Sequence, residues 1–230
     1  MNELELTGRA TTHVVEVEEP GCILHRDAVE PFLRMRAAAA GEGIDVVPVS
    51  SFRDFEAQRR IWNAKYRGQR TLYDRHGRPL EYSSLNSSEL IDAILCWSAM
   101  PGASRHHWGS DIDVIDRAAL PDPRALKLLP IEYSPAGPFA RLNAWLDANM
   151  GTFGFFRPYR TDRGGVSPEP WHLSYASVAN DALRGLTESV LRRALEAADV
   201  DGKEELLRRL PEIGARYVTS VDAAEDIRYA

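Results

Sequence analysis

The stretch "PGASRHHWGSDIDV", from Pro101 to Val114, gathers four polar, chemically versatile side chains ahead of a short alternation of acidic and apolar residues. His106 and His107 are two of only six histidines in the chain, and Asp111 and Asp113 follow them closely. The alternation predicts a strand with both aspartates on one face and the apolar residues on the other. We expect the apolar face to pack on a helix and the acidic face to line a cleft.

His106 and Asp113 stand seven positions apart in the chain. An extended chain would separate them by about 23 Å, so they can share one ion only if the chain reverses between them. Gly109 and Ser110 are residues that permit such a reversal. Carboxylates on one face repel each other unless a cation or a hydrogen-bond donor compensates them. From these residues alone, a metal site and a solvated strand edge both remain open.

A second polar stretch, "GGVSPEPWHLSYA", runs from Gly164 to Ala176. Glu169 and His172 are three positions apart, and the prolines on both sides of the glutamate exclude an ordinary helix. In a regular strand the two side chains would face opposite sides, so we expect a twist or bulge at Pro170. A carboxylate beside a metal-binding imidazole is placed to take a proton from water. The alternative is a strand entry with a buried Trp171 and an exposed glutamate.

The bulk properties restrict the class of protein. A length of 230 residues and an apolar content of 44% predict one domain with a substantial core. The net charge of −6 argues against a binder of nucleic acid or of anionic membranes, which would be basic. No apolar run approaches the roughly 20 residues that span a bilayer. The first residues lack the basic and apolar regions of a signal peptide, so we expect none in the sequence as given. Cys22 and Cys96 are too few for a disulfide framework, and we expect buried, reduced thiols.

Short strands mixed with helices, without a regular βαβ rhythm, predict an α+β fold with a small antiparallel sheet and flanking helices. The expected strands cover 44–50, 111–116 and 171–176. The expected helices cover 28–40, 53–68, 88–99 and 137–154, and two C-terminal helices cover 178–198 and 202–216. We expect Ser87 or Ser88 to cap the helix at 88–99 and Gly151 to end the helix at 137–154. The polar residues 69–88 read as a long surface excursion. The longer insertion of residues 72–103 could cover part of a substrate groove or could only pack against the core.

The two stretches together resemble a known family. "SRHHWGSDID" follows the pattern S-x-H-x-x-G-x-[A/D]-x-D, and "EPWH" follows E-x-x-H further along the chain. Upstream, "SSFRDFEAQ" is similar to an S-x-x-R-x-x-x-x-Q segment. In this order, over about residues 45–176, the motifs resemble those of zinc D-alanyl-D-alanine carboxypeptidases of the VanY and peptidase M15 type. That family shares its fold with hedgehog and lysostaphin proteins.

The resemblance implies that His106, Asp113 and His172 bind zinc. Two imidazoles and one carboxylate leave a fourth position open, which suits a catalytic site rather than a closed structural one. Zinc lowers the pKa of bound water to about 7, and Glu169 would accept the proton and deliver it to the leaving amine. Arg53 would hold the developing oxyanion or the substrate's terminal carboxylate.

The resemblance also implies substrate-side roles for two further residues. Gln58 would orient Arg53 or bind the substrate backbone, and Ser104 would lie near the substrate carboxylate. Asp111 stands where many relatives carry alanine, and we expect it to support the site or to lie at the surface rather than to be a fourth metal ligand. His107 is either a substrate contact or a structural residue.

The predicted organisation is a single domain, residues 1–230, with a peptidase core over 28–176 and a C-terminal helical appendage over 177–230. The predicted function is zinc-dependent cleavage of a peptidoglycan stem peptide, or of a soluble wall-derived peptide, at a bond that involves a D-amino acid. A D-alanyl-D-alanine carboxypeptidase is the leading form of this prediction. Nitrogen and oxygen ligands favour zinc, although cobalt or nickel also fits such a site.

Three alternatives to this function stay open from the sequence. They are an L,D-carboxypeptidase, a wall-lysing endopeptidase with the same site, and a zinc-containing binding module without turnover. Glu169 argues against the binding module, because a pure binder needs no base. The compartment also stays open, since polymerised wall requires export whereas a soluble wall peptide could be met in the cytoplasm. The oligomeric state is not indicated.

Overall fold

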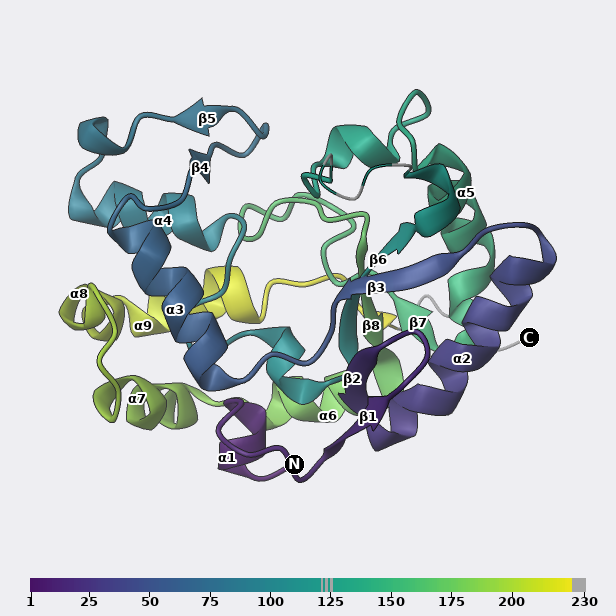
Figure 1. The fold of residues 1–230 in the computed structure, drawn as a ribbon. Coiled ribbons are helices and arrows are strands. Elements are labelled where there is room, and N and C mark those ends of the chain that lie inside the picture. The colour runs from purple at the N-terminus through teal and green to yellow at the C-terminus, as the bar shows by residue number, and fades with distance from the viewer. Residues whose placement is uncertain (121, 123, 125, 225–230) are drawn as a thin grey trace.

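The computed structural model describes residues 1–120, 122, 124 and 126–224 (Figure 1). Its centre is a four-stranded antiparallel sheet with the strand order β3-β6-β8-β7. These strands are β3 (Val46–Ser50), β6 (Asp111–Asp116), β7 (Phe155–Phe156) and β8 (His172–Tyr175). Two hairpins form separate two-stranded sheets: β1 (Val14–Val17) with β2 (Cys22–His25), and β4 (Leu72–Tyr73) with β5 (Pro79–Leu80). The predicted α+β fold with a small antiparallel sheet is confirmed.

Helices flank the sheet. Those before β6 are α1 (Glu3–Leu6), α2 (Arg26–Gly41), α3 (Phe55–Tyr66) and α4 (Ser87–Leu95). Those after it are α5 (Ala140–Asn149), α6 (Ala176–Gly185), α7 (Glu188–Glu196), α8 (Lys203–Arg208) and α9 (Leu210–Ile213). Short 3₁₀ segments cover Tyr82–Ser84, Arg105–Trp108, Arg117–Ala119, Pro130–Tyr133 and Met150–Phe153, and a π-helical segment covers Gly214–Val218. Within the described ranges, no helix has the length and apolarity needed to cross a membrane.

One apolar cluster lies on the far side of the sheet from the polar stretch. Ile112 and Val114 of β6 and Leu173 of β8 pack there with Phe32 of α2 and Leu142 of α5. Figure 1 shows α2 and α5 together on that side of the molecule. The expected packing of the apolar face of β6 on helices is therefore confirmed.

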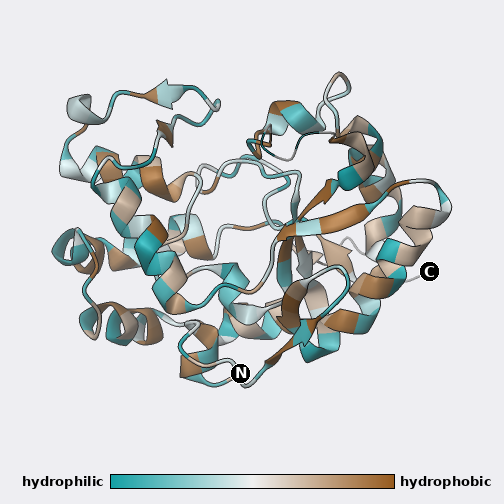
Figure 2. Cartoon of the chain, in the orientation of Figure 1, coloured by the Kyte–Doolittle hydropathy of each residue, from teal (hydrophilic) through white to brown (hydrophobic). Residues whose placement is uncertain are grey.

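A second apolar cluster joins the middle of the chain to its C-terminal part. Trp62 of α3 and Ile94 of α4 pack in it with Leu191, Leu206 and Ile213 of the C-terminal helices. Figure 1 shows these helices gathered on one side of the molecule, and Figure 2 shows hydrophobic residues alternating with hydrophilic ones along them, the pattern of helices with one buried face. The C-terminal helices thus share a core with α3 and α4. Residues 225–230 of the expected appendage lie outside the described residues.

The register of the sheet places polar residues from three strands in one row. Asp113 on β6 pairs with Ser50 on β3 and with His172 on β8. Two positions earlier on β6, Asp111 pairs with Ser174. Because residues two apart on a strand face the same side, these polar side chains share the face opposite the first apolar cluster. The sheet thereby brings the two polar stretches of the sequence together.

Two helix ends differ from the sequence predictions. Gly151 does not end α5, because the chain continues through a 3₁₀ turn to Gly154, whose φ of 79° allows the reversal. The expected single helix over 178–198 is two helices, α6 and α7. A new helix begins after Thr187, whose hydroxyl accepts a hydrogen bond from the Val190 N–H and caps α7.

Other local features were also not predicted. Asn86, rather than Ser87 or Ser88, caps α4, since its side-chain oxygen accepts hydrogen bonds from the second and third N–H groups of the helix. The hairpin β1-β2, the short strand β7 and the hairpin β4-β5 within the 69–88 excursion are additional elements. Cys22 and Cys96 are free and buried, as predicted.

Gly109 makes the chain reversal between the polar loop and β6, with a φ of 67°. A Cβ at this position would lie 2.5 Å from Val14 Cγ1 and 2.6 Å from the His25 backbone nitrogen. Gly109→Ala should therefore lower the free energy of unfolding by about 2 kcal/mol or more, since clash adds to left-handed strain. Denaturant unfolding measures this loss.

Gly164 supplies the matched control, because its φ is 80° and a Cβ there would meet nothing within 4 Å. Gly164→Ala should lower the free energy of unfolding by about 1 kcal/mol, because only the strain of the left-handed backbone conformation is added. Equal losses in the two variants would show that the close approach of Gly109 to the β1-β2 hairpin does not matter.

Candidate metal centre and active site

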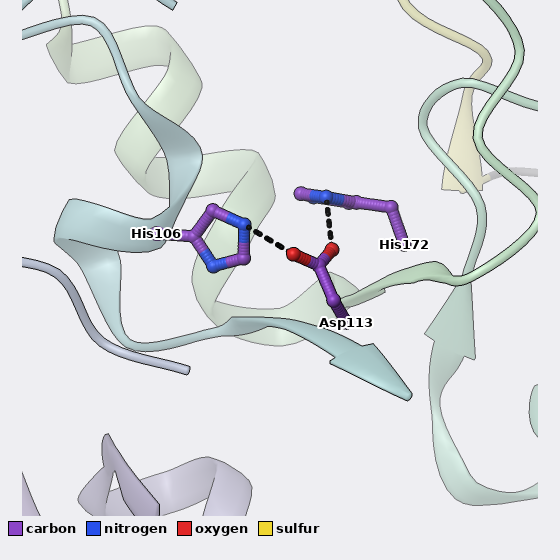
Figure 3. A group of neighbouring side chains, drawn as sticks. All are labelled: His106, Asp113 and His172. Atoms are coloured by element: carbon purple, nitrogen blue, oxygen red, sulfur yellow. Dashed lines mark ion pairs between the residues drawn. The ribbon is translucent and has the colours of Figure 1, made fainter. Parts of the chain in front are cut away.

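His106, Asp113 and His172 converge on one point (Figure 3). His106 Nε2 lies 3.3 Å from Asp113 Oδ2, and His172 Nδ1 lies 3.0 Å from Asp113 Oδ1. The two imidazole rings approach edge to face with their centroids 4.9 Å apart. One potential ligand atom from each side chain lies within 4.8 Å of the other two, and all three side chains are buried.

These three residues fit a divalent cation. Asp113 Oδ1 is buried and accepts no hydrogen bond of ordinary geometry from the described residues. A buried carboxylate oxygen without such a partner is costly, and an ion between the three side chains would satisfy it. Two imidazole nitrogens and one carboxylate oxygen are a zinc donor set that keeps a fourth position open.

Asp111 fixes the orientation of both imidazoles. Its Oδ1 accepts a hydrogen bond from His172 Nε2 at 2.9 Å, and its backbone oxygen accepts one from His106 Nδ1 at 3.1 Å. The nitrogens left to face Asp113 are therefore Nδ1 of His172 and Nε2 of His106. Such hydrogen bonds to the far side of metal-binding imidazoles set their tautomer and raise their basicity. Asp111 is completely buried, so its expected surface alternative is wrong.

Asp111 is itself held in a buried network. Arg105 Nε donates to its Oδ1 at 2.7 Å, and Ser110 Oγ donates to its Oδ2 at 2.6 Å. Arg105 also donates through Nη2 to Ser174 Oγ on β8 at 2.6 Å. Burial would raise the pKa of Asp111, but the charge of Arg105 and the hydrogen bonds outweigh burial and keep that pKa well below its usual range. Asp111 therefore remains a carboxylate.

The same network affects the proton on His172. Burial alone would lower the pKa of His172, but the Asp111 and Asp113 carboxylates beside its ring raise it to about 10. For His106, burial dominates and lowers the pKa. A cation bound at this point would take the place of the proton on His172 Nδ1, because metal ligands must be deprotonated.

Glu169 lies beside this group. Its Oε2 is 3.5 Å from His172 Nδ1, and burial raises its pKa to about 8. The alternative of an exposed glutamate is wrong, since the residue is buried. The expected bulge at Pro170 is absent from the described residues, and a turn precedes β8 in its place. The backbone N–H of His172 closes this turn by donating to the backbone oxygen of Glu169 at 3.1 Å. The turn brings both side chains to one side.

Arg53 faces the same cavity and is held by two neighbours. Its Nη1 donates to Gln58 Oε1 at 2.8 Å, and its Nη2 donates to Ser50 Oγ at 2.7 Å. Gln58 is completely buried and its Nε2 donates to the Ala99 oxygen. Gln58 does not line the cavity, so its position favours orienting Arg53 over contacting a substrate.

His107 lies outside the cavity, in a structural position. Its Nδ1 donates to the Arg53 backbone oxygen at 2.6 Å, and its Nε2 accepts from the Gly102 N–H at 3.2 Å. Burial lowers its pKa to about 3, so the ring is neutral. His107 therefore ties the loop that carries His106 to the segment that carries Arg53.

A cavity of about 380 Å³ adjoins the converging side chains. Arg53, Ser104 and Glu169 line it together with the three residues of the candidate metal centre. Residues 73 and 97–99 also line it, so part of the excursion and the segment after α4 form its wall, and Trp97 stacks on Trp171 there.

Lys65 and Tyr159 are among the lining residues that sequence reasoning missed. Lys65 follows Gln58 by seven positions, which is two helical turns, so helical periodicity could have placed the two on one face. Tyr159 lies outside every motif, and its position depends on the loop that leads to Glu169.

A buried His-Asp-His group beside a buried glutamate, at the end of a cavity on a small antiparallel sheet, defines the class of metal-dependent hydrolases. The family model of VanY D-alanyl-D-alanine carboxypeptidases matches residues 21–178, which is more than half of the chain. The chain belongs to this VanY family.

Individual proteins are similar to this chain over part of its length. An uncharacterised protein of Haemophilus influenzae is 34% identical over 127 residues, which cover 54% of this chain and 95% of that protein. A D-alanyl-D-alanine carboxypeptidase of Enterococcus faecalis is 28% identical over 154 residues, 65% of this chain and 47% of that protein.

Two solved structures share the fold. VanYB in complex with D-alanine-D-alanine superposes with a TM-score of 0.52 at 21% identity, covering 81% of this chain and 89% of the other. A VanY D,D-pentapeptidase mutant in complex with Zn(II) superposes with a TM-score of 0.52 at 22% identity, covering 79% of this chain and 92% of the other.

Asp111→Asn keeps the shape of the side chain but removes the charge that holds His172 and Arg105. We expect zinc to bind this variant about 10- to 100-fold more weakly, measured by competition with a chelator of known affinity. Asp116→Asn, at the far end of the same strand, is the control and should bind zinc like the wild type. Equal affinities of the two variants would contradict the role given to Asp111.

Proposed function

We propose that this chain is a zinc-dependent carboxypeptidase that removes the terminal D-alanine from peptides ending in D-alanyl-D-alanine, such as peptidoglycan stem peptides. The observation that carries the proposal is the buried group of His106, Asp113 and His172 with Glu169 at its edge, inside a cavity. Membership of the VanY family supports the reaction. The D-alanine-D-alanine bound in the structure of the related VanYB supports the choice of peptide.

His106 through Nε2, His172 through Nδ1 and Asp113 through its carboxylate would hold the zinc ion. When bound, zinc supplies a Lewis acid that polarises the peptide carbonyl and lowers the pKa of water to about 7. Asp111 keeps both imidazoles in the tautomers that this binding needs. The protein thus supplies a fixed donor set before any substrate arrives.

Glu169 moves the proton. Its raised pKa of about 8 lies close to neutral pH, where a group can both accept and donate a proton. Oε2 would take a proton from the attacking water and then deliver it to the nitrogen of the leaving D-alanine. Because the side chains of Glu169 and of the three converging residues are buried, the electrostatic effects between them are stronger than in bulk water.

Arg53 would stabilise the oxyanion that forms as the carbonyl is attacked. Its guanidinium is fixed by Gln58 and Ser50, so the group requires little reorganisation during the reaction. Ser104 lines the cavity and would donate a hydrogen bond to the substrate. An L,D-carboxypeptidase or an endopeptidase would use the same residues, and peptides that differ at the cleaved bond distinguish them.

The decisive test is release of D-alanine from a stem pentapeptide. The zinc-loaded chain should release it, chelation should abolish release, and added zinc should restore it. Glu169→Gln should lower kcat by about 10²- to 10⁴-fold because the proton acceptor is lost, while one zinc ion still binds each chain.

Glu196→Gln, on the exposed surface of α7, is the control and should keep full activity. A wild-type chain that binds zinc but cleaves no D-alanine-containing peptide would favour the binding module. Cleavage of an L,D bond, or of a bond inside a cross-link, in place of the terminal D,D bond would favour the other enzymes.

Arg53→Lys keeps the charge but loses the planar fork that Gln58 and Ser50 hold. We expect kcat/KM to fall by about 100-fold, since one donor to the oxyanion is misplaced. Steady-state kinetics on the pentapeptide measure the fall. Kinetics equal to those of the wild type would exclude Arg53 from the reaction.

A further inference from the structure

The candidate active-site cavity has the opposite charge to the chain as a whole. The chain carries a net charge of −6, yet among the described residues Asp113 and Glu169 are the only carboxylates that line the cavity. Basic residues line it in greater number: Arg53, Lys65, Arg70, Arg105 and Lys127. Arg105 is paired with Asp111, but the others leave positive charge facing the cavity. Such a cavity favours a ligand with negative charge.

Lys65 is the least explained of these cations. It lies in the last turn of α3 and is half-buried, and its ammonium makes no hydrogen bond or ion pair with any described residue. Burial lowers its pKa to about 8; Glu169 opposes this effect, whereas Arg70 and Arg53 add to it. A lysine that served only the negative end of the helix dipole would do so equally well while fully exposed. Burial beside two other cations is costly unless a ligand supplies an anion.

The residues that share the cavity with Lys65 indicate the anion it would bind. Glu169, which under the proposed function protonates the leaving nitrogen, lines the same cavity as Lys65. In the leaving residue, the carboxylate is attached to the carbon next to that nitrogen. Gln58 and Ser50 already hold Arg53, which under the proposed function stabilises the oxyanion of the attacked carbonyl. Arg70 and Lys127 also line the cavity but are exposed, so Lys65 is the more buried cation that remains for the leaving residue.

We propose that Lys65 binds the C-terminal carboxylate of the peptide and restricts the enzyme to the last residue of its substrate. This inference rests on the proposed function and goes beyond it. A peptide with a free terminus provides Lys65 with a charge-assisted hydrogen bond. A peptide whose chain continues, or whose terminus is amidated, leaves the half-buried ammonium without a partner and is disfavoured.

The test compares two peptides that differ only at the terminus: diacetyl-L-lysyl-D-alanyl-D-alanine as the free acid and as the C-terminal amide. The zinc-loaded wild type should cleave the acid with a higher kcat/KM. Lys65→Met should lower kcat/KM for the acid by about 10- to 100-fold, mainly through KM, and change the amide little. Lys65→Arg should recover most of the preference.

Arg60→Gln is the matched control, since Arg60 is an exposed cation of the same helix that does not line the cavity. It should keep the wild-type ratio of acid to amide. A Lys65→Met variant that retains this ratio, or that loses activity on both peptides equally, overturns the inference.

Measurements of peptide affinity distinguish a failure of this inference from a failure of the proposed function. Calorimetry with the zinc-loaded Glu169→Ala variant measures the affinity of both peptides without cleavage, with and without Lys65→Met. Tighter binding of the acid that depends on Lys65 supports the inference even if the wild type cleaves neither peptide, which would contradict the proposed function alone. Equal binding of acid and amide overturns the inference even if the wild type is active.

Discussion

The antiparallel register between β6 and β8 is the constraint on which the site depends. It sets Asp113 directly opposite His172 and Asp111 directly opposite Ser174. Because side chains of a strand alternate between its faces, a shift of one residue in either strand would turn these groups into the apolar core and bring Ile112 and Leu173 to the cavity. The burial of the apolar face therefore fixes the register, and the register brings together Asp113 and His172, two of the three candidate metal ligands.

Burial of charge beside that register has a cost that local pairing offsets. Asp111 and Arg105 are both buried, and each would be unfavourable there alone. Together with Ser110 and Ser174 they form hydrogen bonds that connect the polar loop to two strands. The ion pair contributes little net stability compared with apolar packing. Its value lies in holding His172, and through the Asp111 backbone His106, in one orientation.

The sequence predicted the parts of this site that lie within short motifs. The spacing of His106 and Asp113 was interpretable because Gly109 permits a reversal between them, and the alternation in β6 identified its two faces. The residues reached only through tertiary contacts were not predictable. The position of Lys65 in the cavity depends on how α3 lies against the sheet. The residue at which a helix begins depends on its cap, such as Asn86 for α4. The role of Arg105 required knowing that Asp111 is buried, because a surface aspartate needs no such partner.

The C-terminal helices lie mostly outside the segment that matches the family, yet they support the helix that serves the site. Trp62 on α3 donates through Nε1 to the Asp201 oxygen at 2.9 Å, and the Asp201 N–H donates to Asn63 Oδ1 at 3.0 Å. These contacts come from Trp62 and Asn63 of α3, and Gln58 and Lys65 of the same helix serve the site. Since α3 is short, its position relative to the sheet depends on this packing more than on its own helical stability. The C-terminal helices thus help to set where Arg53 is held, although they contribute no residue to the cavity wall.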